Sequence, residues 1–360
     1  MSDPSPKYIQ IKQEILAQIR GGELLPGSRI YSISEIMEKF RVSKVTAVRA
    51  LAEMESEGFV RREHGRGTFV SDQDAGVLQM RTSKRVALIV PDMANPFNVE
   101  VVGSVEKHLR EAGVIVELSC TGYLADTERE LFNRIMAGQH AAGMVLISGG
   151  VSDMGLNSSA PSIPLVVIDH CPEDLVDRCV FINCDHYRGG YEAGTHLAEK
   201  GHREIGYVDW VFTSRARLQG FTQALAEHRL TLPEKRIFPV GAHKQLGHDF
   251  IEFVRREKLT ALFAVNDMLA MQAMQVLRAN KFAIPGDISL MGYDDVLAAR
   301  YLEIPLTTVE QHEEQIGRKA AECILQRMDA KPSGFRPREI LIVPRVVERA
   351  STGRPKGGGR

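Results

Sequence analysis

Long apolar runs, secretion signals and cysteine pairs are all missing from this sequence of 360 residues. No stretch approaches the ~18 uninterrupted apolar residues that a membrane-spanning helix needs, so we expect no membrane span. Residues 1–12 are polar and lack the apolar segment of a signal peptide. The five cysteines form no CxxC pair, which suits a reducing compartment. We therefore expect a cytoplasmic protein.

Net charge is also nearly absent, because 45 basic residues offset 46 acidic ones and leave −1. This balance excludes a polycation and an acidic solvating chain. The average hides an uneven distribution, with +3 over residues 1–85, −9 over 86–335 and +5 over 336–360. Such asymmetry favours a nucleic-acid partner, and the length predicts two or three domains with cores of their own.

The motifs of common enzyme classes are missing as well. No GxGxxG follows an apolar strand, and GxxxxGK[ST], GxSxG and HExxH do not occur. A metal site is conceivable at five neighbouring residues, His170, Cys171, Cys179, Cys184 and His186. Their spacing matches no zinc pattern, however, and small cysteines beside strands are common in cores. We expect no metal and no cofactor.

The first seventy residues have the pattern of three helices and a hairpin. Apolar residues recur at helical spacing from Tyr8 to Ile19, and Gly21-Gly22 ends that helix. Ser32 or Ser34 caps a short second helix, and Ser43 caps a third that runs to about Glu57. Two short strands, 59–62 and 68–70, then flank the sequence His64-Gly65-Arg66-Gly67. Two helices joined by so short a turn predict a helix-turn-helix, followed here by a basic hairpin.

This segment resembles the DNA-binding domain of the GntR family of bacterial regulators over residues 7–70. The resemblance rests on Tyr8-Ile9-Gln10-Ile11, Gly22-Glu23-Leu24-Leu25-Pro26-Gly27, Phe40-x-Val42-Ser43-x-x-Thr46, Ala50-Leu51, Glu57-Gly58-Phe59-Val60 and Gly65-x-Gly67-Thr68-Phe69-Val70. It implies a winged helix-turn-helix with the third helix in the major groove and the wing near the minor groove. The expected DNA-binding residues are Ser34, Ser43, Lys44, Thr46, Val48, Arg49, His64, Gly65 and Arg66.

Two positions depart from the family pattern. Ser34 stands where the family usually has an arginine, and Val48 replaces a second arginine. Arg49 lies one step further, and one step rotates a side chain by about 100°, so it does not inherit that base contact directly. Val48 either touches a thymine methyl group or belongs to the core. The operator sequence is therefore not readable from the family pattern.

Residues 71–84 are expected to form a linker, and residues 85–350 then alternate between continuous apolar runs and amphipathic stretches. That alternation predicts an α/β domain with parallel sheets covered on both faces. Two groups of such units predict two lobes, with ligands bound at the carboxyl ends of the strands. Residues 351–360 are rich in Gly, Pro and Arg and are expected to form a disordered tail. No leucine heptads follow Pro344, so we expect a homodimer rather than a tetramer.

This body resembles the effector domain of the lactose-repressor family, which is similar to periplasmic sugar-binding proteins. The resemblance, from Lys84 to about Pro344, rests on Val90-Pro91-Asp92, Asn95-Pro96-Phe97, Gly189-Gly190-x-x-Ala193-Gly194, Gly201-His202-Arg203, Arg217-x-x-Gly220-Phe221, Asn266-Asp267, Gly292-Tyr293-Asp294-Asp295 and Pro305-Leu306-Thr307-Thr308-Val309-x-Gln311. It implies an effector site at Asn95, Phe97, Ser148, Asp169, Arg217, Asn266, Asp294 and Gln311, of which Ser148, like His243, aligns only loosely.

Each of these polar residues also has a purely structural interpretation. Asn and Asp after strands often cap helices, and a surface salt bridge is the structural alternative for Arg217, which the Gly220-Phe221 context disfavours. The full set fits a polyhydroxylated ligand, since carboxylates accept hydrogen bonds from hydroxyl groups while Arg and Asn donate them. Trp210, the sole tryptophan, either stacks on a sugar ring or serves the core or a dimer contact.

Together these features predict a transcriptional regulator, and a repressor that a sugar-like effector controls is the leading interpretation. An effector-dependent activator, a corepressor-type regulator, and a sugar-binding receptor or enzyme with the same α/β body are the alternatives. The expected partners are double-stranded operator DNA with an inverted repeat, a small sugar or sugar derivative, and a second copy of the chain.

Overall fold

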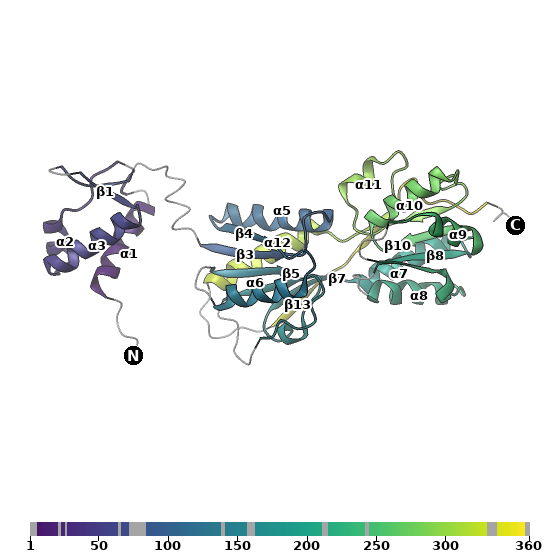
Figure 1. Ribbon diagram of the computed structural model, residues 1–360, viewed down its shortest axis with the longest axis horizontal. Helices are drawn as coiled ribbons and strands as arrows, with labels where there is room; N and C mark the ends of the chain where they lie inside the picture. The colour runs from purple at the N-terminus through teal and green to yellow at the C-terminus, as the bar shows by residue number, and fades with distance from the viewer. Residues whose placement is uncertain are drawn as a thin grey trace. The chain divides into compact units, whose positions relative to one another are not determined.

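The computed structural model describes residues 6–20, 23–25, 27–63, 66–71, 84–137, 141–156, 163–210, 215–241, 245–329 and 337–356. The chain divides into two compact units, Met1–Ser83 and Lys84–Arg360 (Figure 1). In the part of the chain that the structure describes, no helix is long and apolar enough to cross a bilayer. Most of the predicted linker, residues 72–83, lies outside the described residues.

Among its described residues, the first unit has three helices and a two-stranded antiparallel hairpin. The helices are α1 (Lys7–Arg20), α2 (Ile33–Phe40) and α3 (Lys44–Ser56), and the hairpin pairs β1 (Val60–Glu63) with β2 (Gly67–Val70). Ile11 and Ile15 are buried in its core, with Tyr8 and Ile19 packed against them, as the helical spacing predicted. The hairpin confirms the predicted wing.

Two serines start the second and third helices. Ser32, rather than Ser34, caps α2, because its side chain accepts from the backbone of Glu35 while the Glu35 carboxylate accepts from the Ser32 backbone. Ser43 caps α3 by accepting from the Thr46 N–H, as predicted. Arg41 adopts a left-handed conformation with φ 50°, which reverses the chain between the two helices. These caps fix the start of α3, the helix expected to contact DNA.

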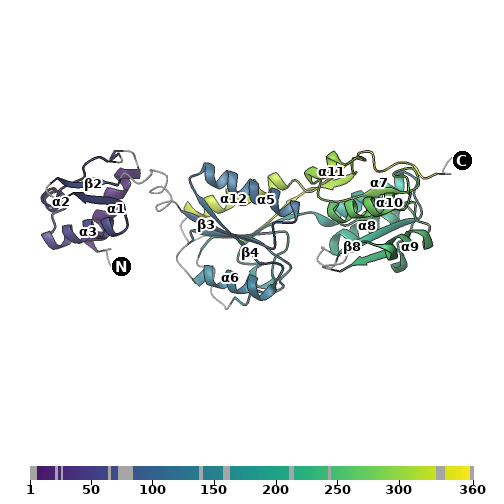
Figure 2. The ribbon, with the colours of Figure 1, turned by 45° about the horizontal axis from the view of Figure 1, so that its top comes forward.

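The second unit begins with a lobe built on a six-stranded parallel sheet of order β13-β7-β6-β5-β3-β4. Its strands are β3 (Arg85–Val90), β4 (Ile115–Cys120), β5 (Gly143–Ile147), β6 (Leu165–Ile168), β7 (Val180–Cys184) and β13 (Arg338–Ile342). Helices α5 (Pro96–Glu111) and α12 (Glu313–Asp329) cover one face of this sheet, and α6 (Ala125–Ala137) covers the other (Figure 2). We call this the first lobe.

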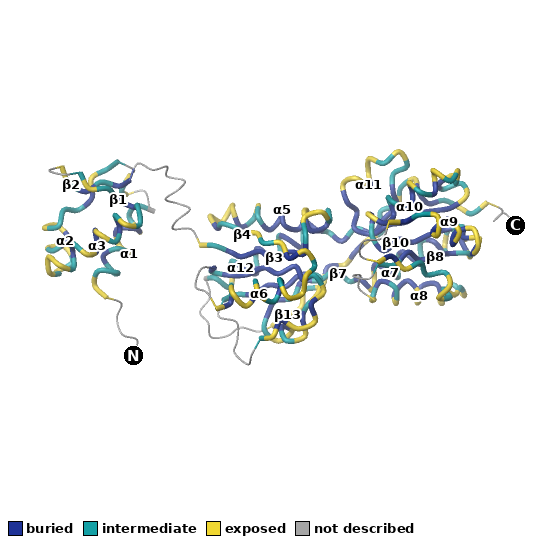
Figure 3. Tube along the Cα trace, in the orientation of Figure 1, coloured by how far each residue is buried: buried dark blue, intermediate teal, exposed yellow. Residues whose placement is uncertain are grey.

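The second lobe has a four-stranded parallel sheet of order β11-β10-β8-β9. Its strands are β8 (Ile205–Trp210), β9 (Ile237–Val240), β10 (Ala261–Ala264) and β11 (Ser289–Met291). Its helices are α7 (His186–Glu199), α8 (Arg215–Glu227), α9 (His248–Arg256), α10 (Asp267–Ala279) and α11 (Leu297–Tyr301). A short antiparallel pair, β12 (Thr308–Glu310) with β14 (Arg345–Val347), completes it. Both sheets are buried between their helices (Figure 3).

The chain passes between the two lobes at three places. It leaves the first lobe after β7, returns between β12 and α12, and leaves again between β13 and β14. Each lobe therefore combines segments that are distant in sequence: β13 pairs with β7 in the first lobe, and β14 pairs with β12 in the second.

The predicted disordered tail is wrong for residues 351–356. The Ser351 side chain is fully buried, donates to the Leu290 carbonyl at 2.6 Å and accepts from the Thr307 N–H at 2.8 Å. The Gly353 carbonyl lies 2.9 Å from Nε2 of His202. These bonds extend the second lobe beyond the predicted boundary at 350. The Gly-, Pro- and Arg-rich composition wrongly predicted disorder because backbone and hydroxyl groups hold this segment. Residues 357–360 lie outside the described part.

Candidate effector and DNA-binding sites

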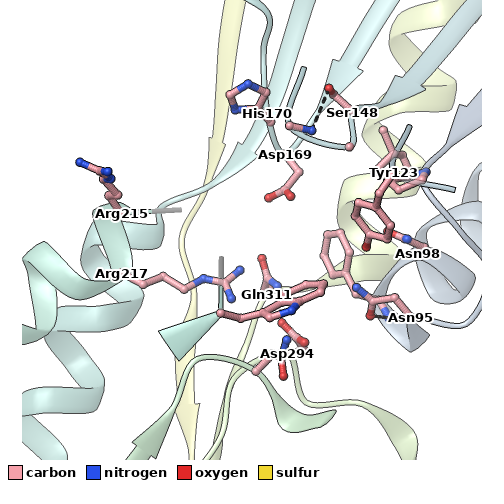
Figure 4. Close-up of a pocket in the computed structure, with 17 residues that line it drawn as sticks. Asn95, Asn98, Tyr123, Ser148, Asp169, His170, Arg215, Arg217, Asp294 and Gln311 are labelled. Carbon is pink, nitrogen blue, oxygen red and sulfur yellow. Dashed lines mark hydrogen bonds between the residues drawn. The ribbon is translucent and has the colours of Figure 1, made fainter. Parts of the chain in front are cut away.

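The carboxyl ends of strands from both lobes surround one cavity of about 390 Å³ (Figure 4). Ser148 follows β5, Asp169 follows β6, Asn266 follows β10 and Asp294 follows β11, so the fold brings distant segments to the same place. All eight residues of the predicted effector site line this cavity. The lining comprises Pro91, Asn95, Phe97, Asn98, Tyr123, Ile147, Ser148, Gly149, Gly150, Asp169, His170, Trp210, Arg215, Arg217, Asn266, Asp294 and Gln311.

Arg217 and Asp169 are joined through a buried histidine. The Arg217 Nε donates to Nδ1 of His186 at 3.2 Å, and Nε2 of His186 lies 2.9 Å from Oδ1 of Asp169. Burial and the Arg217 charge lower the pKa of His186, so its neutral ring accepts from Arg217 and donates to Asp169. Burial is the largest single effect and acts to raise the pKa of Asp169, but the His186 hydrogen bond and neighbouring positive charge, Arg217 included, together outweigh it and lower the pKa of that carboxyl. The carboxylate is therefore ionised and directed at the cavity.

The Arg217 side chain is fixed on every side. It is only 7% exposed, its Nη1 donates to the Val265 carbonyl at 2.7 Å, and its guanidinium lies 3.8 Å from the centre of the Tyr293 ring. Such a cation over an aromatic face is favourable, more so when both are desolvated. The alternative interpretation of Arg217 as a surface salt bridge is wrong, because the side chain is buried at the cavity wall.

Asp294 and Gln311 are hydrogen-bonded to each other at the cavity wall. The Gln311 Nε2 donates to Oδ1 of Asp294 at 2.6 Å, while the Gln311 Oε1 is buried without a protein partner among the described residues. Burial raises the pKa of Asp294 to about 7, against the opposing effects of Arg217 and Gln311. Asp294 therefore exchanges its proton near neutral pH, and Gln311 presents an acceptor oxygen that a hydroxyl group would satisfy.

The two asparagines of the site also cap helices. Asn95 accepts from the Phe97 N–H at the start of α5, and Asn266 accepts from the Leu269 N–H at the start of α10. The capping interpretation is thus correct for both, and it does not remove them from the cavity. Capping uses the side-chain oxygen, so the Asn266 amide nitrogen remains a donor toward a ligand.

Ser148 is turned toward a buried glutamate. Its hydroxyl donates to Oε1 of Glu128 at 2.7 Å, and the Gly149 N–H donates to Oε2 of Glu128 at 2.9 Å. Burial raises the pKa of Glu128, which is inaccessible to solvent. Ser148 lines the cavity, but its hydroxyl proton is already donated to Glu128, and this bond helps to hold the loop after β5 in place. Sequence reasoning missed Glu128 because it lies inside α6, away from any strand end.

Other lining residues were also missed. Tyr123 follows β4 in a turn and meets Trp210 edge to face, with ring centres 6.1 Å apart. Trp210 lies at the end of β8 and lines the cavity. His170 and Arg215 also line the cavity. His243 lies outside the described residues.

The five residues weighed as a metal site are divided between different contacts. His170 lines the cavity, His186 bonds Asp169, and the Cys184 thiol lies 3.7 Å from the Tyr293 hydroxyl. Cys171 and Cys179 lie beside each other. Across the described ranges no group of three or more His, Cys, Asp or Glu side chains could hold a metal ion.

In the first unit, the start of α3 is an exposed part of the predicted DNA-binding surface. Ser43 and Lys44 are exposed, and Thr46 lies beside Ser43 with its hydroxyl 3.0 Å from that of Ser43. Val48 is half-buried, whereas Val45 is 78% exposed and was missed by the sequence prediction. Because α3 starts immediately after Ser43, positions 44 and 45 lie on its exposed first turn. The Ser43 cap, which is visible in the sequence, could therefore have identified Val45 as an exposed position.

The remaining predicted DNA-contacting residues differ in whether their side chains already contact other residues of the protein. Arg49 lies with its guanidinium 4.0 Å from the centre of the Tyr8 ring and 3.4 Å from Glu53, so it is engaged within the unit. Arg66 on the wing is 75% exposed and pairs with Glu63 at 2.7 Å. Ser34 is exposed on α2. His64 and Gly65 lie outside the described residues.

Comparisons with known proteins match both units. Residues 7–70 match the model for bacterial regulatory proteins of the gntR family, and residues 195–352 match a periplasmic binding protein-like domain. The arabinose metabolism transcriptional repressor of Geobacillus stearothermophilus is 28% identical over 96% of this chain and 98% of its own length. The HTH-type transcriptional repressor PurR of Haemophilus influenzae is 31% identical over 76% of this chain and 83% of its own length.

Solved structures of transcriptional regulators are similar to the second part of this chain. A LacI family transcriptional regulator from Enterococcus faecium with bound ribose is 25% identical, with a TM-score of 0.62 over 76% of this chain and all of that chain. A second LacI family regulator, from Sanguibacter keddieii, is 27% identical with a TM-score of 0.64. This chain therefore belongs to the family of bacterial transcriptional regulators that includes these repressors, and it joins a GntR-family helix-turn-helix domain to a periplasmic-binding-protein-like domain of the lactose-repressor type.

Proposed function

We propose that this regulator is a sequence-specific repressor whose operator affinity is controlled by a small sugar or sugar derivative bound between the two lobes. The observation that carries the proposal is the cavity itself. Its walls hold an ionised Asp169, a fixed Arg217 and the Asp294–Gln311 pair, in a chain that also has a winged helix-turn-helix.

The cavity chemistry supports a polyhydroxylated ligand. Asp169 and Gln311 offer acceptor oxygens, Asn266 and Arg217 offer donors, and the Trp210 and Tyr123 rings supply an apolar wall. Hydroxyl groups both donate and accept, so a sugar satisfies acceptors and donors together. A cavity of about 390 Å³ is at the small end of the usual range for ligand sites, which favours a monosaccharide. A relative named for arabinose metabolism and a solved neighbour with ribose support the same class.

Effector control follows from where the ligand would lie. Residues of both lobes line the cavity, so a ligand that contacts both stabilises one lobe arrangement over another. Only such differential affinity shifts an equilibrium between two states. In a homodimer, a change between the lobes alters the spacing of the paired helix-turn-helix domains and weakens binding to an inverted-repeat operator. DNA binding in turn requires the compartment of the chromosome, the cytoplasm.

The DNA contacts we propose lie on α2, α3 and the wing. Ser43, Lys44 and Thr46 surround the start of α3, and helix N-termini favour phosphate oxygens. Val45 and Val48 offer methyl groups to thymine. Ser34 and Arg66 extend the surface to α2 and the wing, respectively.

The experiment is a titration of the protein–DNA complex with sugars. An operator fragment is first selected from random DNA by the purified protein, and its release is then followed by fluorescence anisotropy in L-arabinose, D-ribose, D-xylose, D-glucose and galacturonate. One sugar is expected to release the DNA and to raise the melting temperature of the protein. Tighter DNA binding with sugar would favour the corepressor alternative.

Two results would contradict the proposal. A panel that changes neither DNA binding nor melting temperature would contradict the sugar class, since a ligand that binds only the folded state must stabilise it. Chemical conversion of the sugar, detected by mass spectrometry after long incubation with excess protein, would favour an enzyme. No conversion is expected, because no activated nucleophile lies beside the carboxylates in the described part of the cavity.

A further inference from the structure

Two cysteines face each other directly behind the cavity rim. The thiol sulfurs of Cys171 and Cys179 lie 3.7 Å apart, at the two ends of the loop that joins β6 to β7. The chain is otherwise without such a pair: Cys120 is exposed on β4, and Cys184 and Cys323 are buried elsewhere. A separation of 3.7 Å is close to van der Waals contact, and a disulfide needs the sulfurs at about 2.05 Å.

The loop between the two cysteines is anchored, which keeps the thiols together. The Asp174 carboxylate accepts from the backbone N–H groups of Met154 and Leu156, each at 3.0 Å. Leu175 is fully buried in the core beneath the loop, and the Glu173 N–H donates to the Ser152 carbonyl at 2.8 Å. The two thiols are thus held as neighbours by contacts that do not involve them.

The two thiols differ in access and acidity. Cys171 is partly exposed, whereas the Cys179 side chain is inaccessible to solvent. The hydrogen bond from Cys179 lowers the pKa of the Cys171 thiol, and the same contact together with burial raises the pKa of Cys179. The thiolate is the reactive form, so Cys171 has the character of an attacking residue and Cys179 that of a resolving one.

We propose that Cys171 and Cys179 form a peroxide-sensitive dithiol whose oxidation alters the rim of the effector cavity. The Cys171 thiolate attacks one oxygen of a hydroperoxide; the O–O bond breaks, an S–O bond forms and hydroxide leaves, giving a sulfenic acid. The Cys179 sulfur then attacks the Cys171 sulfur, the S–O bond breaks, and water leaves with the thiol proton. With hydrogen peroxide, two thiols are oxidised to one disulfide and the peroxide is reduced to two waters.

Cys171 is joined to the cavity lining through the backbone, only one or two residues away. Asp169 and His170, which line the cavity, immediately precede Cys171 in the chain. Closing the disulfide draws the sulfurs together by roughly 1.6 Å, which pulls on the backbone that presents the Asp169 carboxylate to His186. In a reducing compartment such a disulfide is transient, which is the behaviour of a sensor rather than of a structural bridge. The dithiol would act in the same way whichever ligand the cavity takes.

The test uses the reduced full-length protein and hydrogen peroxide, followed by alkylation of the remaining thiols in denaturant. Wild type is expected to lose two of its five thiols together and about 2 Da in intact mass. Trypsin cleaves after Arg178, so the disulfide joins the peptide that ends there to the peptide that begins at Cys179. Fragmentation then distinguishes Cys179 from Cys184, which lies in the same peptide.

Single variants separate the two roles. In Cys179→Ala, oxidation of Cys171 should stop at the sulfenic acid, which dimedone traps. In Cys171→Ala, Cys179 should remain a thiol because it is buried. Cys120→Ala is the matched control and should oxidise like wild type. Two results would overturn the proposed dithiol sensor. One is that the Cys171–Cys179 disulfide forms no faster than the exposed Cys120 is oxidised. The other is that Cys179 is oxidised in Cys171→Ala.

Hydrogen exchange tests the coupling to the cavity. The Asp169 and His170 N–H groups donate to the carbonyls of Ile182 and Ile168 in the reduced protein. Their exchange rates are expected to differ several-fold between reduced and peroxide-treated wild type, and not between treated and untreated Cys171→Ala. Unchanged exchange at these amides in a protein shown by mass to be oxidised would overturn the effect on the cavity.

Discussion

At the scale of single residues, the residues that line the cavity also hold the protein together. Arg217 bonds Val265 and His186 and stacks on Tyr293, and Asn266 caps α10. A helix cap and a cavity wall are therefore not competing interpretations. The lactose-repressor resemblance implied all eight members of the set, and all eight line the cavity. His186 and Glu128, which bond Asp169 and Ser148, belong to no motif that carried the resemblance.

The proton of Asp294 should make effector binding depend on pH. Its pKa is raised to about 7, so below that pH the carboxyl is mostly neutral and accepts only weak hydrogen bonds. A hydroxyl that donates to the ionised carboxylate lowers this pKa, so sugar affinity should rise between pH 6 and 8, by at most about tenfold per unit. Calorimetric titration at several pH values measures this slope.

Asp294→Asn serves as the control for that slope. The amide oxygen of asparagine still accepts from Gln311, but the side chain no longer titrates. The variant should bind sugar more weakly than wild type at pH 8, with an affinity that no longer depends on pH. A variant that keeps the wild-type slope would assign the proton to another group.

Loss of Arg217 should give a repressor that does not respond to its effector. A hydrogen bond to a charged group contributes about 1.5–3 kcal/mol, so Arg217→Ala should raise the effector dissociation constant roughly ten- to hundred-fold. Operator binding without ligand should overlay the wild-type curve, because Arg217 lies in the second unit. Arg215→Ala, at the exposed rim of the same cavity, is the matched control and should have the smaller effect. If both variants lose DNA binding without ligand, Arg217 serves the fold alone.

At the scale of elements, the glycines of the lactose-repressor resemblance hold α7 against α8. A Cβ at Gly190 would lie 2.0 Å from the Arg217 carbonyl oxygen, and one at Gly220 would lie 1.9 Å from the Tyr187 carbonyl oxygen. The two helices therefore touch backbone to backbone, which only glycine permits. Since α8 carries Arg217, this contact sets how far that side chain reaches into the cavity.

Gly220→Ala should separate the two helices. Overpacking of this kind costs about 1–3 kcal/mol of unfolding free energy, and the shift of α8 should weaken effector binding as well. Gly103→Ala is the matched control: it lies in the middle of α5 with open space around it and should stabilise by about 0.5–1 kcal/mol. Urea denaturation of both variants compares the two, and equal stabilities would contradict the close helix contact.

The first turn of α3 should carry more of the DNA affinity than Arg49 does. Lys44 is exposed at the start of the helix, so Lys44→Ala should weaken operator binding. If Lys44 contacts a phosphate, the slope of log affinity against log salt concentration should also become shallower by about one. Arg49 is engaged by Tyr8 and Glu53, so Arg49→Ala should mainly lower stability. Anisotropy titrations at several salt concentrations, alongside melting curves, separate the two effects. A larger binding loss in Arg49→Ala would reverse the assignment.

At the scale of the whole molecule, periodicity predicted the architecture and failed where side-chain pattern carries no information. Continuous apolar runs such as 86–90 and 143–147 became buried parallel strands. Helical spacing predicted α1, and serine caps marked the starts of α2 and α3. Tyr123 was missed because turns carry no periodicity, and residues 351–356 were misjudged because composition does not reveal hydrogen bonds. Convergence of strand ends in a parallel sheet predicted where a ligand site would lie, and the lactose-repressor motifs implied which residues would line it.

Pairing of two chains should dominate operator affinity. A fragment of residues 1–75 retains the helix-turn-helix but lacks the second unit, where we place the dimer contact. It should bind one half-site at least a hundredfold more weakly than the full chain binds an inverted repeat. Sedimentation of the full chain and anisotropy with single and paired half-sites measure this. Equal affinities of fragment and full chain would place dimerisation outside the second unit.

The three passages of the chain between the lobes also have a consequence for synthesis on the ribosome. β13 is hydrogen-bonded to β7 in the first lobe, yet nearly all of the second lobe separates them in sequence. Translation adds about 5–20 residues per second, so the helix-turn-helix emerges roughly 15–55 s before the first lobe receives its last strand. During that interval a nascent chain carries a complete DNA-binding unit and no finished sensor, and its edge at β7 stays open to cellular chaperones.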